Sequence, residues 1–177
     1  GYIGKWHLEI PSLNRSVDPE DGATDALDGW TPPGPRRHGF DFWYAYNCNG
    51  KHFNPNYWED SPERIDIDQW SVAHETDMAI GFIENRPADK PFALFMSWNP
   101  PHNPYVAPDE YMERYAGREL PDRPNVKSDE TYQKRFKPYL AAVSSCDDHF
   151  GKLMSCLEKE GLSEKGFAGS YLVDKRV

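Results

Sequence analysis

The sequence predicts an α/β protein with a mostly parallel sheet and long, ordered loops. Residues 71–86 carry apolar side chains at a helical spacing, at Val72, Ala79, Ile80 and Ile83. The run PFALFMSW that follows, residues 91–98, is continuously apolar, which is typical of a strand buried on both faces of a parallel sheet. The chain also has 16 prolines among its 177 residues, well above the usual share of about 5%, and this predicts long irregular connections.

The first half of the chain supplies the other strands. Residues 1–8, GYIGKWHL, suit the end of a buried strand that opens into a loop. Residues 11–37 are dense in Pro, Gly, Asp and Ser, which predicts a long ordered loop. Residues 40–46 alternate aromatic and polar side chains, as a half-buried strand does. Asn49-Gly50 then predicts a hairpin turn into a second short strand.

Two helices complete the prediction, and we expect the whole of residues 1–177 to be a single, incomplete domain. Ser71 is the candidate N-cap of the helix over 71–86, and Pro87 ends it. The final helix is predicted over 138–160, with Pro138 at its first position and Gly161 after its end. An apolar stripe through this helix predicts that it packs on a neighbouring element.

Charge and composition exclude several classes of function. The net charge of −9 argues against nucleic acid as a partner, because such proteins cluster Lys and Arg to neutralise phosphates. The three cysteines, Cys48, Cys146 and Cys156, show neither a disulfide framework nor zinc-ligand spacing. The 177 residues contain no run of about 20 apolar residues, which a membrane span requires, and no charged-then-apolar segment typical of a signal peptide. The oligomeric state is left open by the sequence.

Polar residues follow the predicted strand at 91–98 directly. Parallel sheets bind ligands beyond the carboxyl ends of their strands, and here Asn99, His102 and Asn103 stand among four prolines. Because proline fixes φ, side chains in this loop are held in place before a ligand binds. His102 is therefore a candidate site residue. A histidine that only hydrogen-bonds its own turn is an equally good interpretation at this point.

Lys5 and His7 form a second candidate pair. They lie two residues apart in a segment predicted to be extended, so their side chains point to the same face. A cation and an imidazole placed together can hold an oxyanion and move a proton. On their own, these two residues are better explained as a solvated lysine beside a half-buried histidine.

Four segments resemble the formylglycine-dependent sulfatases of the alkaline-phosphatase-like superfamily. They are GYIGKWHL, PPGPRRHGFDFWYAYNCNGKHF, PPHNPYVAP and YLAAVSSCDDHFGKLMSCLEKEGL. The resemblance runs in order from residue 1 to about 162, and residues 163–177 diverge from it. It implies part of an α/β/α sandwich and an enzyme that hydrolyses sulfate esters. It also implies a sulfated small molecule or glycan as the partner.

The resemblance assigns roles to individual residues. It implies that Lys5 contacts the sulfate and the formylglycine, that His7 is the base of this nucleophile, and that His102 binds the ester oxygen and helps to protonate it. Asn47, His52 and Asn103 are implied as further substrate-binding residues. A Ca²⁺ ion is expected in the parent enzyme, and a periplasmic or secreted location is a family expectation.

The sequence departs from the family pattern at the catalytic centre itself. The formylglycine motif Cys-x-Pro-x-Arg, or its serine form, is absent, because all three cysteines stand in other contexts. The acidic metal ligands of the family would lie before Gly1 and after Ser163, so no metal ligand is predicted within this chain. These departures predict a truncated copy, and we expect the isolated 177-residue chain to have little or no sulfatase activity.

Two other functions remain open from the sequence. A phosphodiesterase or phosphonate monoester hydrolase of the same superfamily would grip a tetrahedral anion in the same way. A noncatalytic carbohydrate-binding module would instead use Trp43, Tyr44, Tyr46 and Trp58 as stacking platforms. Two acidic segments are interpreted as structural: residues 18–28 as a solvated loop, and Asp147-Asp148 as an exposed or hydrogen-bonded part of the last helix.

Overall fold

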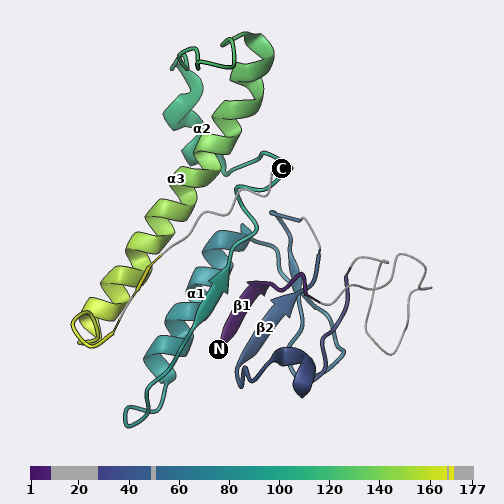
Figure 1. The fold of residues 1–177 in the computed structure, drawn as a ribbon, viewed down its shortest axis with the longest axis vertical. Coiled ribbons are helices and arrows are strands. Elements are labelled where there is room, and N and C mark those ends of the chain that lie inside the picture. The colour runs from purple at the N-terminus through teal and green to yellow at the C-terminus, as the bar shows by residue number, and fades with distance from the viewer. Residues whose placement is uncertain (9–27, 49–50, 167, 170–177) are drawn as a thin grey trace. The chain divides into compact units, whose positions relative to one another are not determined.

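The computed structural model describes residues 1–8, 28–48, 51–166 and 168–169, and these fall into two compact units, residues 1–99 and 100–177. The first unit holds all five strands of the described residues. Figure 1 shows the elements, which are β1 (Tyr2–Lys5), the short 3-10 helix η2 (Pro35–Arg37), β2 (Trp43–Tyr46), β3 (Asn56–Tyr57), β4 (Ile65–Asp66), α1 (Ser71–Asn85), β5 (Phe95–Ser97), α2 (Asp109–Ala116) and α3 (Glu130–Lys159).

The sheet of the first unit is parallel, as predicted. Its strand order is β2-β1-β5, and Ile3 of the central strand is in register with Tyr44 on one side and Met96 on the other. A parallel sheet places the carboxyl ends of its strands at one edge. The ends of β1, β2 and β5 therefore meet at the edge where ligands bind in open α/β folds. Strands β3 and β4 form a separate antiparallel pair.

Strand β2 is more buried than its alternating pattern predicts. All four of its residues are buried, so the prediction of a half-buried strand at 40–46 is wrong. On one face, Trp43 and Ala45 join Tyr2 and Trp6 in an aromatic core cluster. Tyr44 instead stacks on the ring of Tyr57, with 4.5 Å between centroids. Both faces of β2 are therefore covered. Its alternating side chains point into two different buried environments, and neither face is exposed to solvent.

Strand β5 is less buried than its sequence predicts. Only residues 95–97 of the apolar run at 91–98 form the strand, and 58% of the surface of Phe95 is exposed. Within the described residues β5 pairs with β1 alone, so it lies at an edge of this sheet. The prediction of a strand covered on both faces is therefore wrong for the described part of the chain, because a continuous apolar run does not reveal how many neighbours a strand has.

Helix α1 is confirmed, with a different start from the one predicted. Trp70 is the N-cap and Ser71 is the first helical residue, whose backbone N–H donates to the carbonyl oxygen of His52 at 2.8 Å. The helix ends before Pro87, as the sequence predicts. It packs on the sheet: the rings of Phe82 and Phe42 lie 5.1 Å apart, and Figure 1 shows α1 running alongside β1 and β2.

The second unit is built on the pair α2 and α3. Helix α3 begins at Glu130 rather than at Pro138, because Asp129 caps it by accepting a hydrogen bond from the backbone N–H of Tyr132 at 2.8 Å. A side-chain cap upstream thus outweighs the preference of proline for the first turn. The interface between the helices is a cluster of four buried residues: Ala107, Tyr111, Ala141 and Ala142. Asp148 accepts a hydrogen bond from Arg114 at 2.7 Å, as its structural interpretation predicts.

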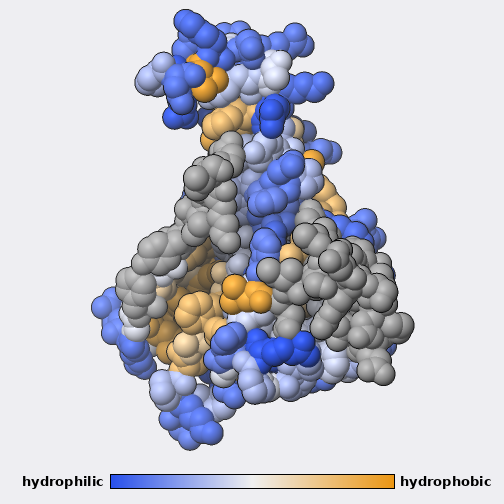
Figure 2. Space-filling model, turned by 45° about the vertical axis from the view of Figure 1, so that its right-hand side comes forward, coloured by the Kyte–Doolittle hydropathy of each residue, from blue (hydrophilic) through white to orange (hydrophobic). Residues whose placement is uncertain are grey.

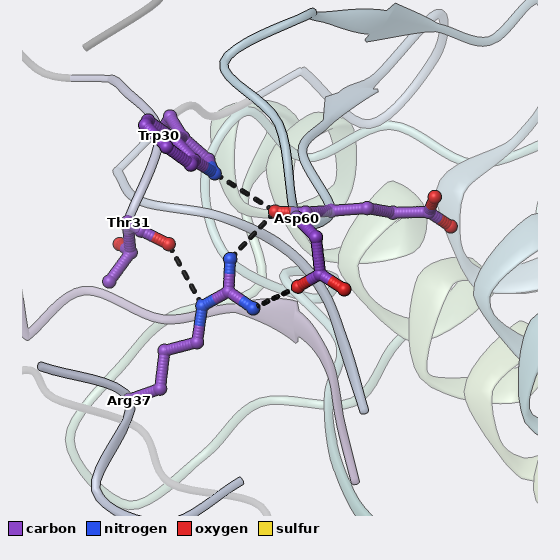
Figure 3. A network of polar contacts seen from close by, with 5 residues as sticks. Trp30, Thr31, Arg37 and Asp60 are labelled. Carbon is purple, nitrogen blue, oxygen red and sulfur yellow. Dashed lines mark hydrogen bonds and ion pairs between the residues drawn. The ribbon is translucent and has the colours of Figure 1, made fainter. Parts of the chain in front are cut away.

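A buried arginine holds the described end of the loop at 11–37, of which residues 9–27 lie outside the described part of the chain. Arg37 is 2% exposed. Its guanidinium group donates to the carbonyl oxygens of Thr31 at 2.9 Å and Glu59 at 2.7 Å, and to the carboxylate of Asp60 at 2.5 Å (Figure 3). Trp30 also donates to the Glu59 carbonyl, at 2.9 Å. We call this network the Arg37 clasp.

On the face that Figure 2 shows, hydrophilic residues cover most of the described part of the chain, and hydrophobic residues gather in a few places. No helix among these residues combines the length and apolarity that crossing a membrane requires. Cys156 is buried, whereas Cys48 and Cys146 are partly buried. Asn49-Gly50, the predicted hairpin turn, lies outside the described residues, although the strand residue Ala45 does form an antiparallel bridge with Trp58 beyond it.

Candidate active site

A lysine and an asparagine meet beyond the ends of the parallel strands. Lys5 is the last residue of β1, and Asn99 lies two residues after the end of β5. The ammonium group of Lys5 donates to the amide oxygen Oδ1 of Asn99 at 3.1 Å. Asn99 is 5% exposed and Lys5 is half-buried. An ammonium group has three N–H donors, so a contact with Asn99 is compatible with a contact to a bound anion.

A buried histidine extends this contact to a third segment. The amide nitrogen of Asn99 lies 3.4 Å from Nδ1 of His52, a residue that is 2% exposed. If the amide is the donor, Nδ1 carries no proton and the neutral ring is protonated on Nε2. Lys5, Asn99 and His52 thus form a connected polar chain, which we call the Lys5 network. The sequence named Asn99 after the strand but did not place it among the substrate-binding residues, although its position two residues past a buried strand was the available signal.

Asn47 supports the same edge through its backbone rather than as a surface group. It directly follows β2, is 2% exposed, and its carbonyl oxygen accepts a hydrogen bond from the backbone N–H of His7 at 3.1 Å. Its own N–H donates to a carboxylate oxygen of Asp28 at 2.7 Å, and the other oxygen of Asp28 accepts from Asn56 at 2.9 Å. Asp28 is 0% exposed, so the interpretation of 18–28 as a solvated loop is wrong at this residue. The rest of that segment lies outside the described residues.

His7 follows β1 in a left-handed backbone conformation. Its φ is 54° and its side chain is exposed. The alternation that would place it on the same face as Lys5 holds for extended backbone, and the positive φ removes His7 from that pattern. His7 therefore lies beside the Lys5 network in the chain, on an edge accessible to solvent, and its role as the base stays a prediction.

A buried carboxyl group lies directly beneath this edge. Glu75 of α1 is 0% exposed, and its Oε1 accepts a hydrogen bond from the Tyr57 hydroxyl at 2.7 Å. A side chain at Gly4 would place its Cβ 3.0 Å from Oε2 of Glu75. Burial raises the pKa of Glu75 to about 8, against the opposing effect of the Tyr57 hydrogen bond, so this group is mostly protonated at neutral pH. Its position between Val72 and Ala79, at spacings of three and four residues on the buried stripe, could have revealed it in the sequence.

His102 and Asn103 belong to the second unit, and both are exposed. Nδ1 of His102 lies 2.6 Å from the carbonyl oxygen of Asn103. A carbonyl oxygen only accepts, so Nδ1 carries the proton, and Nε2 is the acceptor atom of the neutral ring. This contact orders the turn, as the simpler interpretation of His102 predicts, and it also fixes the tautomer. The catalytic role of His102 stays a prediction.

The structure contradicts the stacking platforms of the carbohydrate-binding module. Trp43, Tyr44 and Tyr46 are 4%, 3% and 3% exposed, and Trp58 is 0% exposed. Trp43 belongs to the core cluster with Tyr2 and Trp6, and the rings of Tyr44 and Tyr46 contact the ring of Tyr57. A buried ring cannot stack on a sugar. The four aromatic residues therefore do not support the interpretation as a carbohydrate-binding module.

The calcium site expected of the parent enzyme does not fit the residues present. Among the described residues, no group of three His, Cys, Asp or Glu side chains is placed to hold a metal ion. Asp28, a fully buried carboxylate near the sheet edge, accepts hydrogen bonds from Asn47 and Asn56. Hard cations such as Ca²⁺ need six to eight oxygen ligands, which this set does not supply.

Comparison with known proteins matches these features to one family. The family model described as Sulfatase matches residues 1–167. An endo-4-O-sulfatase of Bacteroides thetaiotaomicron is 31% identical over 177 aligned residues, which cover 92% of this chain and 35% of that protein. An ulvan-active sulfatase of Formosa agariphila is 30% identical, over 92% of this chain and 30% of that protein.

A solved structure gives the same result for the fold. A Bacteroides thetaiotaomicron protein, solved in work on the metabolism of multiple glycosaminoglycans, superposes with a TM-score of 0.77 at 30% identity. The match covers 91% of this chain and 36% of that one. The chain thus spans about a third of the length of the relatives it matches, and the alkaline-phosphatase-like α/β fold predicted from the sequence is confirmed. The family match extends over both compact units, and the chain belongs to the sulfatase family.

Proposed function

We propose that this chain is the sulfate-binding part of a sulfatase that hydrolyses sulfate esters of a carbohydrate. The observation that carries the proposal is the Lys5 network. It sets a half-buried cation, held by Asn99, beyond the ends of three parallel strands. Membership of the sulfatase family supports a sulfuryl oxygen as the partner of that cation.

Cleavage of a sulfate ester requires a positive charge held in a fixed position. Negative charge builds on the sulfuryl oxygens as a sulfate ester is cleaved, and a cation placed in advance stabilises it without reorganising. Asn99 limits the positions available to the Lys5 ammonium group, and His52 in turn contacts Asn99. In this proposal His7 is the base for the nucleophile, and His102 binds and protonates the leaving oxygen. Asn47 and Asn103 would act as further substrate-binding residues.

The nucleophile and the metal would come from other parts of a longer protein. No formylglycine motif occurs in the 177 residues, and no described cluster suits a cation. We propose that a formylglycine and a Ca²⁺ ion are supplied by segments outside this chain, and that the complete protein works in the periplasm or outside the cell. The 177-residue chain then binds sulfate but does not turn over a sulfate ester.

The proposed substrate is a sulfated polysaccharide. Two relatives at 30% identity or more are described as an endo-4-O-sulfatase and an ulvan-active sulfatase. The support is similarity alone, so the position of the sulfate on the sugar is not part of the proposal. Inorganic sulfate, as the group common to all such substrates, is the suitable first probe.

The test is a titration of the isotope-labelled chain with sodium sulfate, followed by amide NMR shifts at constant ionic strength. We expect saturable shifts at Lys5 and Asn99 that disappear in Lys5→Met. The control is Lys90→Met, which removes an equally charged but exposed lysine of the same unit and should leave the shifts unchanged. Equal sulfate binding by wild type and Lys5→Met would refute the proposal. Turnover of an aryl sulfate by the chain, abolished by His102→Ala, would refute its inactivity.

A further inference from the structure

Four aromatic rings form a continuous strip in the second unit. Tyr132, Phe136 and Tyr139 lie on one face of α3, at a spacing of four and then three residues. The rings of Tyr132 and Phe136 are stacked, with centroids 4.9 Å apart and planes at 16°. The Tyr139 ring lies 5.2 Å from Phe136, and the Tyr105 ring lies 5.7 Å from Tyr139. We call these four residues the aromatic strip.

The strip is partly open to solvent. Each of its four residues is intermediate between buried and exposed, in contrast to the fully covered rings around β2. Three of the four are tyrosines, whose hydroxyl groups need water or a polar partner. The aromatic strip is therefore a connected set of rings whose members are all partly accessible to solvent.

Two arginines flank the strip. The Arg123 guanidinium group lies 5.9 Å from the centroid of the Phe136 ring. Arg135 is three residues after Tyr132 and four before Tyr139, so it is their neighbour on the helix surface. Both arginines are exposed, and neither forms an ion pair with an acidic side chain of the described residues.

The charge of this region differs from that of the chain. Residues 118–139 contain six Lys and Arg against four Asp and Glu, whereas the whole chain has a net charge of −9. A local excess of cations on an acidic protein attracts an anionic ligand to that place. It also argues against an apolar partner for the strip, because docking one there would desolvate both arginines.

The loop that carries Arg123 is fixed to α3. Gln133 accepts a hydrogen bond from the backbone N–H of Leu120 at 3.1 Å and donates to the Leu120 carbonyl oxygen at 2.9 Å. Arg123 and Val126 exchange two backbone hydrogen bonds, at 2.9 and 3.1 Å. The backbone of Arg123 is therefore fixed beside the strip before any ligand arrives, which lowers the entropy cost of binding.

We propose that the aromatic strip, with Arg123 and Arg135, binds the sugar rings and sulfate groups of an anionic oligosaccharide. The aromatic faces would stack on the apolar faces of sugar rings, and each guanidinium group matches the paired oxygens of a sulfate. This subsite is separate from the Lys5 network in sequence and lies within the second unit. The choice of a sulfated glycan as the ligand rests on the proposed function. Binding at the aromatic strip does not involve Lys5, His7 or His102.

The test is calorimetric titration of the 177-residue chain with a chondroitin 4-sulfate hexasaccharide and with the same hexasaccharide after chemical desulfation. We expect the sulfated probe to bind at least about tenfold more tightly, the scale set by charged hydrogen bonds. Arg123→Gln/Arg135→Gln should weaken its binding by about tenfold or more. The matched control, Lys90→Gln/Lys165→Gln, makes the same change in net charge at two exposed lysines elsewhere and should change the affinity less than about twofold.

Two further variants separate this inference from the proposed function. Tyr132→Ala/Tyr139→Ala should weaken the binding of the sulfated hexasaccharide while leaving unchanged the NMR shifts that inorganic sulfate causes at Lys5 and Asn99. If Lys5→Met abolishes binding and the arginine and tyrosine variants bind normally, the strip is not a subsite but the proposed function stands. Equal losses in the arginine pair and the lysine pair would show attraction by net charge alone and would overturn the inference. Circular dichroism of every variant checks that α3 is retained.

Discussion

The ammonium nitrogen of Lys5 lies 3.1 Å from Oδ1 of Asn99, although 94 positions separate the two residues in the sequence. The parallel pairing of β1 and β5 creates this contact, since it brings the carboxyl ends of both strands to the same edge. Asn99 also links Lys5 to His52. The family resemblance assigns Lys5 to the sulfate group. The residues that orient Lys5, Asn99 and His52, lie outside the segment GYIGKWHL that carries this part of the resemblance.

Substitutions of Asn99 should show how much sulfate binding depends on where the Lys5 ammonium group is held, because they leave the Lys5 charge itself in place. Asn99→Ala keeps the charge but removes the 3.1 Å contact, so we expect sulfate binding to weaken by about five- to tenfold, as for the loss of one hydrogen bond to a charged group. Asn99→Asp would place a carboxylate against the ammonium group and compete with the anion, so its binding should fall further. The measurement is the sulfate titration by NMR; undiminished binding by Asn99→Asp would show that Lys5 does not hold the anion.

The buried carboxyl group of Glu75 should make stability depend on pH. Burial raises its pKa from 4.5 to about 8, so the folded state binds more protons than the unfolded state between these values. The free energy of unfolding therefore falls as pH rises through this window, by up to about 1.4 kcal/mol per pH unit from this group. Glu75→Gln removes the titration, so its stability relative to wild type should increase from pH 4.5 to 8, reaching on the order of a few kcal/mol.

Urea unfolding across this pH range measures the effect. The control is Glu84→Gln on the same helix, where the carboxylate is exposed and the pH dependence should stay close to that of wild type. A constant difference between Glu75→Gln and wild type from pH 4.5 to 8 would mean that Glu75 has an ordinary pKa in the folded state.

A methyl group at Gly4 should be strongly destabilising. Its Cβ would lie 2.5 Å from the backbone carbonyl oxygen of Ser97, and φ at Gly4 is 102°, a conformation that L residues rarely adopt. We expect Gly4→Ala to lose about 3 kcal/mol or more of unfolding free energy. Gly81→Ala is the matched control, because its Cβ meets nothing within 4 Å in the interior of α1, and it should stabilise by about 0.5–1 kcal/mol. Similar effects of the two changes in urea unfolding would contradict the packing described for β1.

The Arg37 clasp should depend on the arginine far more than on its acidic partner. Arg37→Met removes the donor to the buried carbonyl oxygen of Thr31 and one of the two donors to that of Glu59, which keeps its hydrogen bond from Trp30. We expect a loss of about 3 kcal/mol. The Asp60 side chain is 78% exposed, so Asp60→Asn should cost less than about 1 kcal/mol. Thermal and urea unfolding test both variants, and a larger loss in Asp60→Asn would reverse our ranking of the contacts.

Local patterns in the sequence were sufficient for the helix at 71–86 and for the strand–loop transition at Lys5. Apolar spacing, a terminating proline and a short apolar run are determined by residues close together in the sequence. They can therefore be interpreted without knowing which other elements pack against the segment. Burial was the weaker part of the prediction. The strand at 40–46 was predicted to be half-buried and the run that contains Phe95 to be buried on both faces, and both predictions were wrong. Exposure depends on which elements cover a strand, and the period of a strand does not show this.

The candidate site divides in the same way. Lys5, His7 and His102 were identified from motifs and family resemblance, and the family was confirmed by comparison. Asn99 as the partner of Lys5, and Glu75 beneath Gly4, emerged only from the folded chain. The aromatic strip also needed the structure, since Tyr105 and Arg123 reach α3 from other segments.

The amino-acid order alone therefore determined the family, the α/β class and the residue types suited to a sulfate ester. Tertiary structure decided which of those residues touch, which rings are covered and which carboxyl group is held in a protonated state. The physical reason is range: helical periodicity and motif spacing are properties of neighbours along the chain. Hydrogen bonding, desolvation and burial are set by atoms that only the pairing of β1 with β2 and β5 brings together.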